Sequence, residues 1–175
     1  MEHLNALRET LPDTARDVKM NLQTVLQEGP LTPAQLWGVA VASAYASRND
    51  ALTKATIADA KAAGIAEGVL EDARASAILM GMNNVLYRFR HVVGKETYSE
   101  RPARVRMGRL VQVTSNKPDL ELFSLAVSAI NNCESCVKAH EHSAMEGGIS
   151  EDQIFDAIRI ASVFSSAAIA LETIQ

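Results

Sequence analysis

The sequence predicts an all-α protein built as a helical bundle. Aromatic residues make up only 5% of its 175 residues, and alanine is frequent, whereas strands favour aromatic and β-branched side chains. Apolar residues recur at three- and four-residue spacing along most of the chain, as in amphipathic helices. Two segments also carry complete signals for the start of a helix. These observations together favour packed helices over a sheet.

The first half is expected to hold five helices. Apolar residues at helical spacing predict four of them: Glu2–Thr10, Asp13–Leu26, Ala51–Ala63 and Glu67–Tyr87. The fifth lies between the second and third of these and begins after Thr32, which can cap it. Pro33 suits the first helical position, and Gln35 completes a capping box.

The second half is expected to hold three helices. Apolar spacing predicts the first two over Pro118–Ile130 and Cys133–Glu146. The last helix follows Ser150, which can form a capping box with Gln153. Its most apolar stretch, Ile154–Leu171, is interrupted by charged residues and softened by serines, so a buried helix is expected rather than a membrane span.

Composition limits the classes of partner and the location. A chain with 47% hydrophobic and 22% charged residues is long enough to bury a core as a single domain over residues 1–175. The formal net charge is −4, and the basic residues are taken as scattered, so neither nucleic acid nor a membrane surface is expected as a partner. Charges near Met1 exclude an apolar signal-peptide core, which predicts a cytoplasmic protein.

The chain is expected to consist of two halves, residues 1–90 and 118–175, joined by the charged segment 91–117. The halves look duplicated, because residues 37–50 align with residues 123–136 through an aromatic residue followed by small and branched ones. On this alignment Ser47 and Asp50 take the places of the two cysteines of the second half. A silent copy of the site is therefore expected in the first half.

The two cysteines are the first candidates for chemistry, in the motif Cys133-Glu134-Ser135-Cys136. A permanent bridge is not presumed in a reducing cytosol. Asn131 and Asn132 are expected to end one helix and cap the next, which places Cys133 in the first turn and Cys136 one turn on. The partial positive charge at a helix N-terminus favours a thiolate, so reactive cysteines are expected.

A histidine and a carboxylate complete the candidate site. His140 follows Cys136 by four residues and Cys133 by seven, so the three side chains share a helical face. Glu121 lies about three turns before the helix break, where a helical hairpin folds it back toward His140. A carboxylate behind an imidazole fixes its tautomer and raises its basicity, which predicts a dithiol with a proton relay.

A zinc site is the competing interpretation of this cluster. Cys133, Cys136, His140 and His142 are all zinc ligands by residue type. His142, however, is offset by two positions and faces away from His140 on a helix, which makes tetrahedral closure difficult. No metal is therefore expected. The remaining histidines are expected at the surface: His3 and His91.

The segment Glu121–His142 closely resembles the active-site segment of the alkyl hydroperoxidase D (AhpD) family, in the carboxymuconolactone decarboxylase-like superfamily. The likeness extends through Gln35–Gly38, Ser43–Asn49 and Gly81–Arg88. The resemblance implies an AhpD-like all-α bundle with a duplicated core. It also implies a homotrimer that acts as an antioxidant peroxidase, reducing organic hydroperoxides through its dithiol.

The resemblance further implies the role of each residue. Cys136 corresponds to the cysteine that forms a sulfenic acid, and Cys133 to the proton donor and resolving thiol that closes a disulfide with it. Glu121 and His140 correspond to the proton relay. The sequence departs from the best-known members at position 135, where they carry a histidine and this chain has Ser135 in place of an imidazole.

The implied cycle uses no bound cofactor. The resemblance implies that an external dihydrolipoyl group, on a lipoyl-bearing acyltransferase of a 2-oxoacid dehydrogenase, reopens the disulfide. It also implies a peroxiredoxin (AhpC-like) as a partner. Two other functions remain open: a non-catalytic redox-sensing dithiol module and a decarboxylase-like relative. A sensor is typically fused to an output domain, and a decarboxylase has no need of two thiols and a relay.

Overall fold

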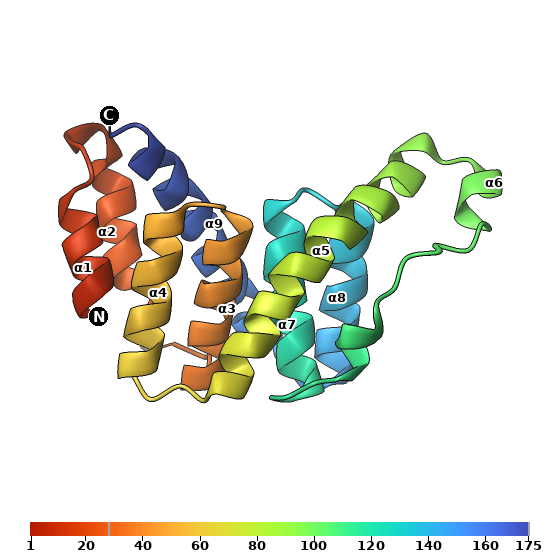
Figure 1. Ribbon diagram of the computed structural model, residues 1–175, viewed down its shortest axis with the longest axis horizontal. Coiled ribbons are helices and arrows are strands. Elements are labelled where there is room, and N and C mark those ends of the chain that lie inside the picture. Colours follow the sequence, from red (N-terminus) through yellow and green to blue (C-terminus); the bar gives the residue numbers. More distant parts are fainter. Residues whose placement is uncertain (28, 175) are drawn as a thin grey trace.

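The computed structural model describes residues 1–27 and 29–174, and every regular element in these residues is helical (Figure 1). The predicted all-α class is confirmed. The elements in chain order are α1 (Glu2–Glu9), the 3₁₀ helix η1 (Asp13–Ala15), α2 (Arg16–Thr24), α3 (Pro33–Ala46), α4 (Asp50–Ala62), α5 (Glu67–Val93), α6 (Glu96–Ser99), the 3₁₀ helix η2 (Gly108–Val111), α7 (Lys117–Ile130), α8 (Glu134–Glu146) and α9 (Glu151–Glu172).

Both predicted capping boxes are present. The Thr32 hydroxyl accepts a hydrogen bond from the Gln35 backbone N–H at 3.2 Å, and the Gln35 side chain accepts one from the Thr32 N–H at 3.0 Å. Ser150 and Gln153 make the same two bonds at 3.2 and 2.9 Å. Each box pairs two N–H groups, so α3 and α9 begin where the sequence predicts.

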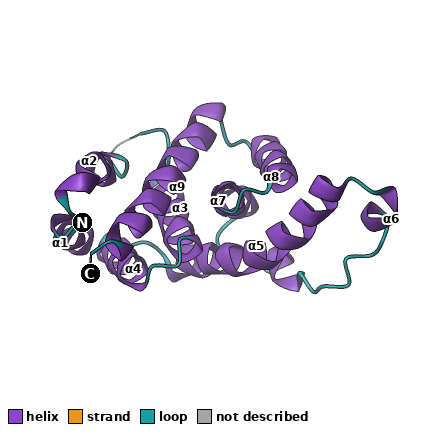
Figure 2. Cartoon of the chain, turned by 90° about the horizontal axis from the view of Figure 1, so that it is seen from above, coloured by secondary structure: helices purple, strands orange, loops and turns teal. Residues whose placement is uncertain are grey.

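The core lies along α3 and α7, which pack against each other and are both covered by α5 and α9 (Figure 2). Their close approach depends on Gly38 in α3. A Cβ atom at this position would lie 2.1 Å from the ring of Phe123 in α7, and that ring is fully buried. Because Gly38 has no side chain, the Phe123 ring of α7 can pack directly against the backbone of α3.

Helix α9 is the one described helix that is long and apolar enough, by composition alone, to cross a membrane. In the fold it packs against α2, α3 and α7 instead. Ile160 and Phe164 are fully buried, and the buried Asp156 is paired with Arg159 at 2.5 Å. The expectation of a buried core helix over this stretch is confirmed.

The two halves repeat the same three helices. Helices α3, α4 and α5 begin at residues 33, 50 and 67, and α7, α8 and α9 begin at 117, 134 and 151, each 84 residues later. A cavity of about 600 Å³ between α5 and α9 shows the same relation, since each lining residue of the first half has a counterpart 84 residues on. The bundle is therefore internally duplicated.

This offset corrects the predicted alignment of the silent copy. Asn49 and Leu52, rather than Ser47 and Asp50, correspond to the two cysteines. The prediction was two residues out because it matched the aromatic residues of α3 and α7, which do not occupy equivalent helical positions. Asn49 caps α4 through the N–H of Leu52 at 2.9 Å, and Leu52 is fully buried. In the first half, the two positions that correspond to the cysteines are therefore occupied by a helix-capping residue and a core residue.

The connection between the halves is an arm, defined here as residues 88–109. Helix α5 continues to Val93, six residues beyond the predicted end, and Gly94 stops it with a φ of +63°. The chain then passes through α6 and returns at η2, so that the arm projects from the rest of the bundle (Figure 1). Phe89 and Tyr98 pack with ring centroids 5.2 Å apart and hold its two sides together.

Candidate active site

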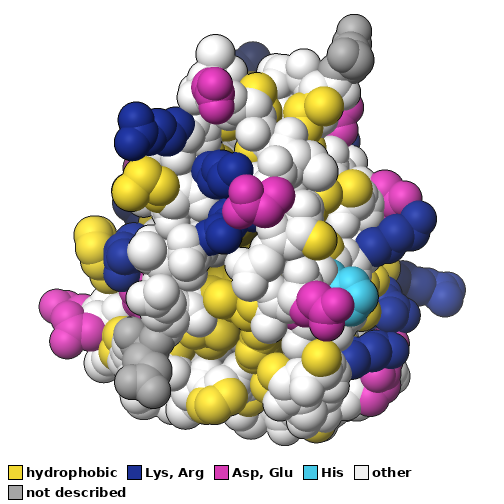
Figure 3. All heavy atoms as spheres, turned by 90° about the vertical axis from the view of Figure 1, so that its left-hand side faces the viewer, with side chains coloured by type: hydrophobic (Ala, Val, Ile, Leu, Met, Phe, Trp, Pro, Cys, Tyr) yellow, Lys and Arg dark blue, Asp and Glu magenta, His cyan; other side chains and the backbone are white. Residues whose placement is uncertain are grey.

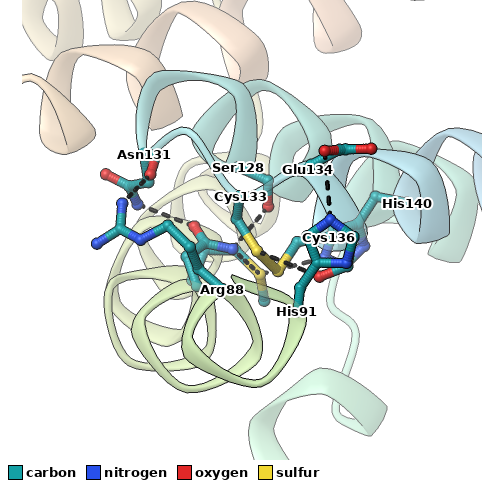
Figure 4. The surroundings of a disulfide bond; sticks show 11 residues. Arg88, His91, Ser128, Asn131, Cys133, Glu134, Cys136 and His140 are labelled. Carbon is teal, nitrogen blue, oxygen red and sulfur yellow. Dashed lines mark hydrogen bonds and ion pairs between the residues drawn. A yellow bond between two sulfur atoms is a disulfide. The ribbon is translucent and has the colours of Figure 1, made fainter. Parts of the chain in front are cut away.

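Cys133 and Cys136 form a disulfide at the start of α8, with their Cα atoms 5.2 Å apart (Figure 4). Helix α7 ends at Ile130, and Asn132 turns the chain with a φ of +55°. Because the two asparagines are used in this turn, Cys133 itself is the N-cap residue and Cys136 the third helical residue. The prediction that the asparagines cap α8 is therefore wrong by one position.

The two sulfur atoms differ in access. Cys133 is fully buried, whereas Cys136 is 7% exposed and lines a pocket of about 240 Å³. Cys136 also lies within the first turn of α8, where unpaired backbone N–H groups stabilise a thiolate. The Ser135 hydroxyl lies 3.8 Å from the Cys133 sulfur. Cys136 is therefore the thiol that a molecule in the pocket meets once the disulfide is reduced.

His140 and Glu121 come together across α7 and α8, which pack as a helical hairpin. His140 Nδ1 lies 2.7 Å from Glu121 Oε2, and both side chains are largely buried, with 17% and 15% of their surface exposed. His140 also lines the pocket beside Cys136. The structure thus places three of the four predicted site residues around this pocket or directly behind it, with Cys133 bonded to one of them.

The charge of Glu121 determines which ring nitrogen of His140 donates a hydrogen bond to it. Burial raises the pKa of this carboxyl, but the hydrogen bond and charge of His140 and the charge of Lys117 outweigh burial, so the pKa is lowered. Lys117 Nζ lies 3.6 Å from Glu121 Oε1. An ionised carboxylate only accepts hydrogen bonds, so Nδ1 of His140 is the donor. His140 Nε2 is then left for proton transfer.

Apart from Ser135, the residues that complete the pocket were not among the predicted site residues. Met80 is fully buried, and its sulfur lies 3.2 Å from His140 Nε2. The other lining residues come from α5, the arm and α8: Asn83, Tyr87, Met107, Ser135 and Ala139. The α5 residues lie on one helical face, but their place near the dithiol depends on how α5 crosses α8.

A hydrogen-bond network holds the α7–α8 turn against α5. Asn84 donates to Ser128 Oγ at 3.0 Å and accepts from the Asn131 side chain at 2.9 Å. Arg88 donates to the Asn131 carbonyl at 2.6 Å. His91 is exposed, as the sequence predicts, and lies 3.3 Å from Glu134 in the first turn of α8 (Figure 4). These hydrogen bonds therefore fix the position of the turn that precedes the disulfide.

The zinc ligand set considered from the sequence is not assembled. The two cysteine sulfurs are bonded to each other, and the exposed His142 pairs with Glu146 at 3.4 Å. Across residues 1–27 and 29–174, no group of three or more His, Cys, Asp or Glu side chains is placed to hold a metal ion. The cluster around Cys136 is arranged as a dithiol with an acid–base pair.

The chain is similar to one known protein family and to several proteins that share one name. The profile of the Carboxymuconolactone decarboxylase family matches residues 98–174. The chain is 60% identical over 172 residues to "Alkyl hydroperoxide reductase AhpD" of Anaeromyxobacter dehalogenans strain 2CP-C, covering 98% of this chain and 92% of that protein. It is 47% identical over 161 residues to the protein of the same name from Acidobacterium capsulatum, covering 91% and 87%. The protein of that name from Rhodospirillum centenum is 44% identical over 169 residues, covering 97% and 90%.

Proposed function

Because the chain belongs to the AhpD family of alkyl hydroperoxide reductases, we propose that it reduces organic hydroperoxides with the Cys133–Cys136 dithiol and a His140–Glu121 proton relay. Membership makes it a peroxide-acting oxidoreductase. The observation that carries the assignment of residues is the shared pocket of Cys136 and His140, with Glu121 2.7 Å behind the imidazole.

The first step consumes the peroxide at Cys136. The thiolate attacks one peroxide oxygen, the O–O bond breaks, and the alkoxide leaves with a proton as an alcohol. Cys136 is oxidised by two electrons to a sulfenic acid. Exposure to the pocket and the N-terminal position in α8 support Cys136 in this role, because its partner sulfur is fully buried.

The second step closes the disulfide. The Cys133 thiol attacks the sulfenic sulfur of Cys136, and water leaves. The two residues are already within one helical turn, so the step needs little rearrangement. Protons are moved through His140 Nε2, while the Glu121 carboxylate stabilises the imidazolium that forms. The Ser135 hydroxyl lies 3.8 Å from the Cys133 sulfur, within hydrogen-bonding distance of it.

A small external dithiol returns the enzyme to its reduced form. A pocket of about 240 Å³ admits a slender chain rather than a globular domain. A dihydrolipoyl group attacks the disulfide with one sulfur, and its second sulfur then attacks the mixed disulfide intramolecularly. The enzyme recovers two thiols and the lipoyl group becomes a cyclic disulfide. We propose a lipoyl-bearing acyltransferase as carrier, a peroxiredoxin as a further partner, and the reducing cytoplasm as the site of this cycle.

Self-association as a homotrimer is part of the proposal. Large apolar side chains are exposed at seven-residue spacing on α5: Ile78, Val85 and Val92. Val85 lines the same 600 Å³ cavity as the exposed Ile169 of α9, so exposed apolar residues of both helices border one cavity. An apolar surface shared by two helices is typical of a protein–protein contact.

Peroxide turnover with a defined reductant tests the function. The protein is supplied with tert-butyl hydroperoxide and free dihydrolipoamide, and formation of the alcohol is followed at matched thiol concentration with glutathione. We expect dihydrolipoamide to support much faster turnover, because the second attack by glutathione must come from another molecule. Equal rates would contradict the lipoyl assignment, and no turnover with either reductant would contradict the peroxidase assignment.

A further inference from the structure

The arm carries a concentration of positive charge that the sequence analysis overlooked. Residues 88–109 contain seven of the 17 Lys and Arg residues but two of the 21 acidic ones, so the arm has a formal charge of +5 and the rest of the chain −9. The expectation that basic residues are scattered is therefore wrong for this segment. That expectation rested on the low net charge of the whole chain, which hides the separation of the positive arm from the negative remainder.

Three arginines of the arm are available for a partner. Arg101, Arg104 and Arg106 are exposed, and none of them forms an ion pair within the part of the chain that the structure describes. Arg109, at the base of the arm, is instead held by Asp72 at 2.7 Å. At the opposite end of the molecule basic and acidic side chains are interspersed (Figure 3), so the positive surface is local.

Both ends of the arm lie close to the segment that carries the disulfide. At its outgoing end, His91 lies 3.3 Å from Glu134 beside the first turn of α8, and Arg88 bonds the α7–α8 turn. At its returning end, Met107 lines the pocket that contains Cys136. Arg106 directly precedes Met107 of the pocket lining, and Arg101 and Arg104 lie further out on the same returning segment of the arm.

We propose that the arm is the docking surface for an acidic protein domain that carries the reducing dithiol on a flexible side chain. This inference rests on the proposed function, since it concerns the carrier of the reductant. The pocket is too small for the carrier itself, so the domain remains outside while its dithiol enters. A basic surface beside the pocket attracts an acidic domain and orients it, which raises the rate of association.

Charge variants of the arm test the proposal against a matched control. In one variant Arg101, Arg104 and Arg106 are each replaced by Gln. The control variant replaces three cations of the opposite end, in α2 and α4: Arg16, Lys54 and Lys61. Turnover of tert-butyl hydroperoxide is measured with two reductants, a reduced lipoylated domain of net negative charge and uncharged free dihydrolipoamide.

We expect the arm variant alone to lose about tenfold in kcat/KM for the lipoylated domain at low salt, and we expect this difference to vanish above about 0.5 M salt. Its kcat/KM for free dihydrolipoamide stays within about twofold of the unmodified protein. An equal loss in the control variant, or an equal loss with both reductants, would overturn the docking proposal.

Binding measured without turnover separates this proposal from the proposed function. Calorimetric titration of the oxidised protein with the lipoylated domain should show binding that the arm variant loses and the control retains. The binding result does not depend on turnover. If neither dithiol supported turnover, only the proposed function would be contradicted. Two further results would contradict the docking proposal. One is a change in the oligomeric mass of the arm variant, and the other is tighter binding of the protein to duplex DNA than to the lipoylated domain.

Discussion

Nδ1 of His140 lies 2.7 Å from Oε2 of Glu121, although 19 residues separate them in the chain. The hairpin of α7 and α8 brings the imidazole and the carboxylate onto facing helical sides, largely out of solvent. Because Glu121 Oε2 accepts a hydrogen bond from Nδ1–H, the other ring nitrogen is the one on the pocket side, next to the sulfur of Met80. The pair therefore gives α8 an oriented acid–base group beside its dithiol.

Removing either member of this pair should slow turnover. Replacement of Glu121 by Gln, or of His140 by Phe, is expected to lower kcat/KM for the peroxide by roughly 10²–10⁴, the usual contribution of a positioned acid–base group. His142→Phe is the matched control, because this histidine is exposed on the same helix. If both relay variants keep normal rates while the disulfide still forms, the helix N-terminus alone activates the thiols.

Lys117 should set the acid limit of activity. Its charge helps to lower the pKa of Glu121, so Lys117→Met lets that pKa rise. Since the relay needs the ionised carboxylate, the acid limb of the kcat/KM profile is expected to move to higher pH. Lys138→Met, which removes the ion-pair partner of the exposed Glu134, is the control and should leave the limb in place. An unmoved limb in both variants would show that Glu121 does not govern it.

The two cysteines should differ in the products they leave. Cys136→Ser is expected to abolish peroxide turnover, because a serine hydroxyl is not ionised at neutral pH. Cys133→Ser should retain one reaction with peroxide and trap Cys136 as a sulfenic acid or a mixed disulfide. Mass spectrometry after peroxide treatment distinguishes them. Oxidation at Cys133 with Cys136 left as a free thiol would reverse the two roles.

Asp72 should contribute to stability in a defined pH range. Burial raises the pKa of its fully buried side chain, but hydrogen bonds from Ser115, Arg109 and Thr114 outweigh this and lower the pKa from 3.8 to about 2. The contribution is present above the unfolded value and is lost as pH falls through the folded one. We expect Asp72→Asn to lower the free energy of unfolding at pH 7 by about 2 kcal/mol. Urea denaturation at pH 7 and at acid pH measures this.

The same measurements give a second criterion for Asp72. The unmodified protein should lose this amount of stability between pH 3.8 and about 2, whereas the variant should show a smaller loss over that range. Parallel pH dependences for the two proteins would mean that Asp72 has the same pKa in the folded and unfolded states.

The contact between Gly38 and Phe123 should make position 38 intolerant of a side chain. Gly38→Ala places a Cβ 2.1 Å from the Phe123 ring, so the ring or the helices must shift, at a cost of about 1–3 kcal/mol in unfolding free energy. At Gly81, also within a helix, an added methyl group would meet no described atom within 4 Å. Gly81→Ala is therefore expected to be neutral or stabilising by up to about 1 kcal/mol. Equal effects at both glycines would contradict this account of the core.

Local signals in the sequence were sufficient for most of the helices. The capping boxes at Thr32 and Ser150 act within four residues, so neighbouring helices do not alter them. The pairing of Glu121 with His140 was also predictable, because two helices joined by a short break must fold back on each other. The end of α5 was missed although its signal was present, since Gly94 marks it.

Features that depend on tertiary packing were not predictable in this way. The apolar spacing of α5 predicts a buried face, but it does not say that Met80 on this face meets the imidazole of His140. Met107 is separated from the dithiol by a long connection, and it reaches the pocket because Asp72 anchors the returning chain near Thr114. The position of Cys133 was off by one residue because the left-handed turn at Asn132 has no unambiguous sequence signal.

The first copy of the internal repeat carries no thiols, which limits the number of electrons that one chain can store. In α4 the counterparts of Cys136 and His140 are Leu52 and Thr56, both fully buried, and α1 packs against that helix. A scaffold with two copies of the same three helices therefore holds a single dithiol, which stores two electrons. Without a reductant, each chain should consume one peroxide molecule and then stop, so the size of the initial burst counts the chains.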